Sequence, residues 1–523
     1  MPNPPSRMKD DTSLFPVFSK KHEIVAFSST AIALYGYDQG MMSLINTNRN
    51  YLRTMRIGEE SPIVGIIVSV YYLGCAVGSV VASWLADKRG RKPSIFACLA
   101  TTSFGNILMF ISGLSMNGSS PWDGYAIVFM LLGRIVMGLG VGGIDAVIPV
   151  YSSELASDGA RGRALAQEFQ MNIFGLLMAF SINLGVTIGL GKDNQWAWRL
   201  PIIIMQIFPV LLMSLISRLP ETPRWFMSKE RRTDASKALE SIYGKQGSKS
   251  KLAELEEIQD NESDEKVGYK DMLLPGGSQF HPTMVTIMGQ INQALTGYGA
   301  VSVYGPQIFE LLGFSVRDAE YLTLGNYFFY FGMMTIAWMS IDVLGRRRLM
   351  LWGSMGLAGS FALLTLFGGL SYDFPNIPSL AVGIPGSIIL YLATAIFGIG
   401  WLATVWLIPT EIYPSTARAQ GSAISVIVWG LANFTVTLLA PIGFNNLKYW
   451  LFLVFAATNT FAGWWTWKYS PESGGRSFEE NQEFFISAVD DKSWSVKKVD
   501  GGKFLRMPGN DIDTEREPLL RST

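Results

Sequence analysis

The chain has 523 residues, of which 49% are hydrophobic and only 16% are charged, well below the roughly 25% of soluble domains. Lys and Arg together number 42, as do Asp and Glu, so the net charge does not indicate a nucleic-acid partner. Two cysteines in apolar runs and two widely separated histidines argue against a disulfide scaffold, a metal site and a histidine-dependent enzyme. We expect no cofactor.

Twelve apolar runs, each long enough to cross a bilayer as a helix, follow a polar segment at residues 1–23. A hydrocarbon core takes roughly 20 residues of helix, and the polar segment lacks the order of a cleaved signal peptide. The even number of spans puts both termini on one side of the membrane. The predicted spans are 24–46, 62–85, 94–114, 124–148, 165–189, 199–218, 283–311, 321–343, 349–371, 382–408, 419–444 and 449–470.

The spans fall into two groups of six, residues 24–219 and 283–470, and a polar tail follows at 471–523. The linker between the groups, 220–282, is predicted to form soluble helices, although the acidic composition of 260–265 is equally typical of a disordered tether. Basic residues are modestly enriched in the short loops on the linker side of the membrane. This bias favours a cytoplasmic linker and cytoplasmic termini.

Charged motifs in the first group of spans recur in the second at a nearly constant offset, 255 residues between Gly90 and Gly345 and 257 between Glu154 and Glu411. Repetition at one offset predicts a duplicated chain, which is typical of two-half transporters. The charged members are Asp87, Arg91, Glu154, Arg161, Glu221 and Arg224 in the first half, and Asp342, Arg346, Glu411, Arg418 and Glu472 in the second.

Several short motifs lie at the span boundaries and together cover most of the chain. They are Gly36-Tyr37-Asp38-Gln39-Gly40, Gly90-Arg91-Lys92, Gly133-Arg134, Pro149-Val150-Tyr151-Ser152-Ser153-Glu154, Pro220-Glu221-Thr222-Pro223-Arg224 and Gly345-Arg346-Arg347. With these motifs in this order, the chain resembles the sugar porter family of the major facilitator superfamily, of the fungal hexose and sugar transporter type. The resemblance implies an all-α membrane protein of the major facilitator fold, with twelve transmembrane helices in two six-helix bundles and a cytoplasmic helical linker.

The resemblance also implies a function, which is proton-coupled symport of a sugar or polyol by alternating access between the two bundles. Two alternatives stay open: an uncoupled sugar facilitator, and a non-transporting sugar sensor of the same fold. The implied partners are the solute, the proton and the lipid bilayer. The chain is not expected to be an enzyme.

Asp38 lies within the apolar first span, where a charge costs several kcal/mol unless it is paired or faces water. Arg134, early in the fourth span, is the natural partner. In proton-coupled members of the family, residues at these two motif positions couple protonation to conformation, and the resemblance implies that role here. The alternative is a permanent structural ion pair.

The repeated charges resemble the family's cytoplasmic latch. Its salt bridges would hold the two bundles together on the inside while the cavity faces outward, and would separate when the cavity opens inward. The alternative is charge that only sets the topology.

The substrate pocket matches the family only in part, because three usual amide ligands are replaced by Phe169, Ala294 and Gly299. Aromatic rings and amides near the midplane are the groups expected to hold a sugar. Packing explains Trp406 equally well, and an interhelical hydrogen bond is the alternative for Gln293. The candidate ligands are Gln293, Trp406 and Tyr35 at matching positions, with Asn292, Asn172 and Trp429 as local additions.

Two further motifs concern modification and sorting. Asn117 begins an N-glycosylation sequon in a loop predicted to lie outside. Residues 515–520 in the tail resemble an acidic dileucine signal that would engage sorting machinery. We expect a multi-pass protein of the plasma membrane.

Overall fold

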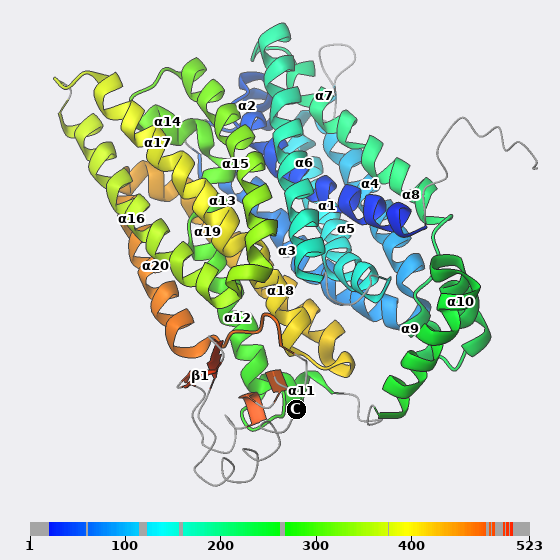
Figure 1. Ribbon diagram of the computed structural model, residues 1–523. Helices are drawn as coiled ribbons and strands as arrows, with labels where there is room; N and C mark the ends of the chain where they lie inside the picture. Colours follow the sequence, from blue (N-terminus) through cyan, green and yellow to red (C-terminus); the bar gives the residue numbers. More distant parts are fainter. Residues whose placement is uncertain are drawn as a thin grey trace, which may run out of the picture.

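The computed structural model shows a bundle of long helices lying side by side (Figure 1). The structure describes residues 20–58, 61–114, 123–155, 161–261, 267–374, 376–476, 481–482, 484–486, 495–496, 498–500 and 503–505.

The elements follow one another as the sequence predicts, with six rods before the linker and six after it. The first half contains α1 (Lys20–Ile45), α2 (Arg49–Met55), α3 (Pro62–Arg89), α4 (Arg91–Ile111), η1 (Asp123–Tyr125), α5 (Ala126–Leu155), α6 (Arg161–Leu190), α7 (Trp196–Met205) and α8 (Ile207–Ile216). The linker contains α9 (Pro223–Ser228), α10 (Arg232–Asn261) and α11 (Tyr269–Leu273).

The second half ends in a short tail hairpin. Its elements are α12 (Phe280–Leu295), α13 (Tyr298–Val303), α14 (Gly305–Leu311), α15 (Val316–Leu344), α16 (Arg346–Asp373), α17 (Ser379–Phe397), the π-helical turn η2 (Gly398–Leu402), α18 (Ala403–Ile412), α19 (Ser415–Leu447), α20 (Trp450–Tyr469), β1 (Lys498–Asp500) and β2 (Lys503–Leu505). The two strands pair antiparallel outside the bundle.

Nine helices in the described part of the chain are long and apolar enough to cross a membrane. With α1, the rod α12–α14 and α20, the twelve predicted spans are confirmed as helical rods of an all-α membrane fold. The seventh rod is not continuous, because Gly297 has a φ of 83° and ends α12. A break of this kind leaves backbone groups free to line a cavity within the membrane.

The two ends of the bundle differ. The linker helices α9, α10 and α11 lie with the tail strand β1 at one end, which we call the linker end, and α2 lies at the opposite end, which we call the distal end (Figure 1). Between the halves, the largest contacts join α3 to α19 and α6 to α15.

Glycines allow α5 to pack closely against α3. An ideal Cβ at Gly142 would lie 2.1 Å from the carbonyl oxygen of Cys75, and one at Gly138 would lie 2.2 Å from that of Tyr71. In lipid, helix association depends on such close backbone contact.

We expect Gly142→Ala to lower the stability of the detergent-purified protein by about 1–3 kcal/mol, because the added methyl group meets backbone atoms rather than a movable side chain. The control is Gly185→Ala in α6, where the new Cβ has no neighbour within 4 Å. Thermal unfolding measures both variants, and equal melting temperatures would refute the packing argument.

Candidate functional site

A buried ion pair lies in the first half. Asp38 on α1 and Arg134 on α5 are each 1% exposed, and Oδ1 of Asp38 is 2.5 Å from Nη1 of Arg134. The guanidinium also donates to the carbonyl oxygens of Ile67 and Val68, both at 3.3 Å, and lies over the ring of Tyr71. The helices thus bring together the two residues that the sequence predicted to pair. Because the pair is buried, removing one of its two partners is expected to lower stability by about 3–5 kcal/mol.

A cluster of charged residues lies at the linker end of the first half. Arg91, the first residue of α4, lies 3.1 Å from Asp87 and 3.1 Å from Glu154. The carboxylate of Glu221 accepts the backbone N–H groups of Arg91 and Lys92, at 3.1 and 3.0 Å. Glu221 therefore caps the N-terminus of α4, where unpaired N–H groups favour an anion.

The second half repeats this arrangement residue by residue. Arg346 lies 3.0 Å from Asp342 and 2.7 Å from Glu411. Glu472 accepts the backbone N–H groups of Arg346 and Arg347, at 2.8 and 3.1 Å. The repeat found in the sequence thus corresponds to two structurally equivalent clusters.

These contacts differ from the latch expected from the sequence. The ion pairs of Arg91 and Arg346 lie within one half each, because each arginine begins a helix beside the carboxylates of its own bundle. Glu221 and Glu472 bind backbone N–H groups as helix caps. A role of these charges in gating stays a prediction.

Three predicted charges remain, namely Arg224, Arg418 and Arg161. Arg224 is half-buried in α9, and Arg418 donates to the carbonyl oxygen of Tyr413. Arg161 begins α6, but its side chain lies outside what the structure describes, as does Asn117 with its sequon.

A cavity of about 40 Å³ lies at the centre, between the two halves. Five of the six predicted substrate ligands line it: Tyr35, Asn172, Gln293, Trp406 and Trp429. Asn292 is buried but does not line it. The volume suits little more than one water, against about 300–1,000 Å³ for small-molecule sites, so the centre is contracted in this conformation.

Two amide side chains of the cavity were not predicted from the sequence. Gln39 donates to the Tyr35 hydroxyl at 2.7 Å, and Asn433 projects from α19 one turn after Trp429. The available signal was spacing, since each lies four residues beyond a predicted ligand on the same helix face.

Asn433 occupies the region of one missing amide. An ideal Cβ at Gly299 would lie 3.1 Å from Oδ1 of Asn433. An amide from α19 therefore lies where a side chain at position 299 would project from α13.

Comparison with known proteins agrees with the family resemblance of the sequence motifs. Residues 24–485 match the family described as "Sugar (and other) transporter". The chain belongs to this sugar transporter family. It is 27% identical over 504 residues to the MFS-type transporter oryC of Aspergillus oryzae, covering 94% of this chain and 90% of the relative. It is also 26% identical over 492 residues to the D-xylose-proton symporter of Escherichia coli, covering 87% and 94%.

Solved structures share the fold of this sugar transporter family member. The structure of the proton:xylose symporter XylE bound to 6-bromo-6-deoxy-D-glucose superposes with a TM-score of 0.74 at 23% identity. The match covers 89% of this chain and 99% of that one. The major facilitator fold predicted from the sequence is confirmed.

Aromatic side chains from both halves of the transporter surround the cavity. Trp406 packs against Phe169 with ring centroids 5.8 Å apart, and Trp429 packs edge-on against Tyr35 at 5.5 Å. Gln293 donates its amide N–H₂ to the carbonyl oxygens of Trp401 and Leu402 in η2. Its carbonyl oxygen is thus the group with which Gln293 can accept a bond from a solute hydroxyl.

The distal end carries an ion pair that sequence analysis missed. Lys192, in the turn after α6, lies 2.7 Å from Glu320 on α15, and Arg317 lies 3.0 Å from the same carboxylate. This pair joins the two halves, and Glu320 is 1% exposed. Partners 128 positions apart in different halves cannot be identified from one sequence.

We expect Glu320→Gln to open the distal end, because the amide removes the charge that holds Lys192. Labelling of a cysteine placed at Ser302, in the cavity wall, by an impermeant maleimide should become about tenfold faster for each 1.4 kcal/mol lost. Asp318→Asn, at the exposed start of α15, is the matched control and should label like the parent. Unchanged labelling in Glu320→Gln would show that the pair does not keep this end closed.

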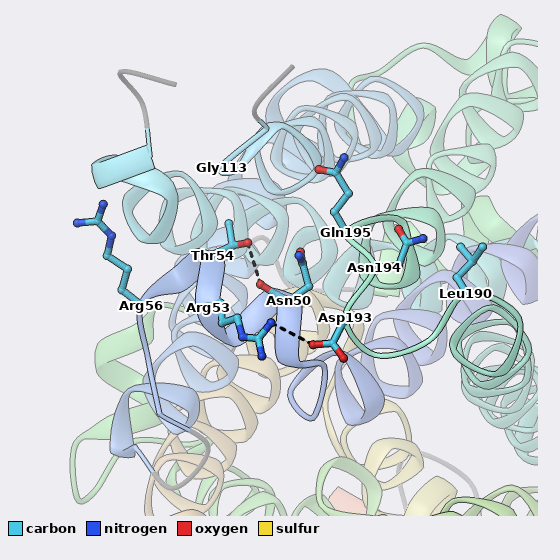
Figure 2. A pocket seen from close by; sticks show the side chains of 9 residues that line it. All are labelled: Asn50, Arg53, Thr54, Arg56, Gly113, Leu190, Asp193, Asn194 and Gln195. Carbon is cyan, nitrogen blue, oxygen red and sulfur yellow. Dashed lines mark hydrogen bonds and ion pairs between the residues drawn. The ribbon is translucent and has the colours of Figure 1, made fainter. Parts of the chain in front are cut away.

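A larger hollow of about 850 Å³ also opens at the distal end (Figure 2). It is lined by Asn50, Arg53, Thr54, Arg56, Gly113, Leu190, Asp193, Asn194 and Gln195. Arg53 is 3.1 Å from Asp193, and both side chains are more than half exposed. None of the predicted substrate ligands lines this hollow, so the central cavity is the candidate site.

Proposed function

We propose that the protein is a proton-coupled symporter of a sugar or polyol that works by alternating access. The observation that carries this proposal is the buried Asp38–Arg134 pair beside a cavity lined from both halves. A carboxylate paired with a cation releases its proton readily, whereas one separated from the cation in a dry site holds it. Alternating the contact with conformation therefore couples proton binding to transport.

The pocket supports a hydroxyl-rich solute. Trp406 and Trp429 offer ring faces to the apolar side of a sugar, and Asn172, Gln293 and Asn433 offer amides to its hydroxyls. The amide from Asn433 compensates in position for the one absent at Gly299. This compensation favours transport over the sensor, which loss of the amides had motivated.

Gating and topology complete the proposal. The linker end faces the cytoplasm with both termini, and the two charged clusters there take part in gating, each within its own bundle. The chain divides into a segment 1–23, bundles 24–219 and 283–470, a linker 220–282 and a tail 471–523. We propose the plasma membrane as its location, with glycosylation at Asn117 and sorting through the tail.

The test is uptake of radiolabelled D-xylose, D-glucose and myo-inositol by proteoliposomes with and without an uncoupler. Accumulation that collapses with the proton gradient is the expected result. Uptake that is indifferent to the uncoupler would identify a facilitator instead. Binding without uptake of any of the three solutes would identify a sensor.

A further inference from the structure

We infer that Asp145 is a second proton-carrying group, which relays the proton between Asp38 and the linker end of the first half. The inference rests on the proposed proton coupling and adds a route to it. Asp145 lies in the middle of α5 and is 7% exposed, and its Oδ2 has no hydrogen-bond partner within the described part of the chain. A carboxylate left unpaired in a membrane span is costly and calls for a functional explanation.

The position of Asp145 on α5 aligns it with other polar groups. It follows Arg134 by 11 residues, and Ser152 follows Arg134 by 18. At about 3.6 residues per turn, these are close to three and five whole turns, so the three side chains share one face of the helix. Asp145 lies roughly 17 Å along the axis from Arg134, toward the linker end.

A second unpaired carboxyl continues this row. Glu168 on α6 is 5% exposed, lies against the hydroxyl of Ser152, and has no partner for Oε2 among the described residues. Ionisable and hydroxyl groups are therefore spaced along one side of α5, from the Asp38–Arg134 pair to Asp145 and then to Ser152, which meets Glu168.

Two tyrosine hydroxyls lie near both Asp38 and Asp145, and neither is hydrogen-bonded to either carboxylate in this conformation. Tyr35 on α1 and Tyr71 on α3 lie close enough to interact electrostatically with both Asp38 and Asp145. Cys75 on α3 also lies close enough to interact electrostatically with Asp145, and Cys98 on α4 lies beside the neighbouring Gly143. Pro149 has no N–H, so the backbone carbonyl oxygen of Asp145 lacks its usual donor in the helix. This free carbonyl oxygen is a further polar group beside the Asp145 side chain.

The relay balances as a proton transfer. The O–H bond of protonated Asp38 breaks, and the proton crosses the roughly 17 Å to Asp145 by successive transfers along water that enters with the solute and along the hydroxyls of Tyr35 and Tyr71. Each hydroxyl accepts one proton and gives up its own, and a new O–H bond forms on the Asp145 carboxylate. Asp38 is left ionised and pairs again with Arg134, as in this structure. Release of the proton from Asp145 past Ser152 and Glu168 completes the passage.

The test compares wild type, Asp145→Asn, Asp145→Glu and Asp38→Asn in proteoliposomes, with the same three radiolabelled solutes. We expect Asp145→Asn to lose gradient-driven accumulation but to keep solute exchange, and Asp145→Glu to restore accumulation. A coupled wild type whose accumulation survives in Asp145→Asn would overturn the relay alone. A wild type indifferent to the uncoupler would overturn both the coupling and the relay.

A second measurement covers the case in which Asp145→Asn does not fold. Dicyclohexylcarbodiimide attacks protonated carboxyl groups in apolar surroundings, and peptide mass spectrometry locates the adduct. In the wild type we expect an adduct on Asp145 that diminishes as the pH rises, because a relay group must both bind and lose a proton. An adduct independent of pH, or none at any pH, would contradict the relay.

Discussion

Replacing Asp38 by asparagine is expected to abolish uphill accumulation while leaving exchange of solute across the membrane intact. The amide oxygen can still accept the hydrogen bond from Arg134, so the contact between α1 and α5 is retained in shape. It cannot bind or release a proton, however, and solute should equilibrate to equal concentrations on both sides. Gradient-driven uptake and counterflow in proteoliposomes measure the two quantities separately.

The control for this variant is Asp234→Asn, the same chemical change at an exposed position in the linker helix α10. Asp234 pairs there with Arg231, and such surface pairs contribute only about 0–1 kcal/mol. Accumulation should be unchanged. If Asp38→Asn still concentrates the solute, Asp38 does not carry the proton and the pair is structural.

Removal of the Glu472 side chain should lower the free energy of unfolding more than any other substitution proposed for stability. Its carboxylate accepts the N–H groups of Arg346, Arg347 and Gly474 at 2.8–3.1 Å and is 5% exposed. The N-cap residue of α16 is Gly345, which has no side chain to accept the first N–H groups of the helix. We expect Glu472→Ala to cost about 3–5 kcal/mol, because buried donors lose their charged acceptor.

Glu472→Gln is the matched variant, since it keeps an acceptor oxygen but loses the charge. Its cost should be smaller, up to about 2 kcal/mol, which is the value of a partly buried charge at a helix terminus. Thermal unfolding of the purified variants measures both. If the two variants melted at the same temperature as the wild type, Glu472 would not anchor α16.

The sequence predicted the fold well because its signals are local. Span length, the polar linker and the recurring charges around Gly90 and Gly345 each depend on short stretches of chain, and membrane solvation turns them into helices of known length. The breaks were not predicted. Gly297 interrupts the seventh rod, and η2 is a π-helical turn within the tenth. Composition does not reveal either feature, because the sequence stays apolar through both positions.

The site was predicted less completely. Asp38 and Arg134 were paired correctly from motif and burial cost, whereas Gln39 and Asn433 emerged only when α1 and α19 were placed around one cavity. Asp145 carried the same signal as Asp38, a carboxylate within an apolar span, but offered no partner in a recognisable motif.

The sequence by itself determined twelve spans, a duplicated chain and the family, since each depends on composition or on motifs along the chain. Tertiary structure alone decided that Glu221 and Glu472 cap helices, that Asn433 lies where a side chain at Gly299 would project, and that Lys192 meets Glu320. The physical reason is that these contacts join groups far apart in sequence, so only the packing of the helices fixes which of them meet.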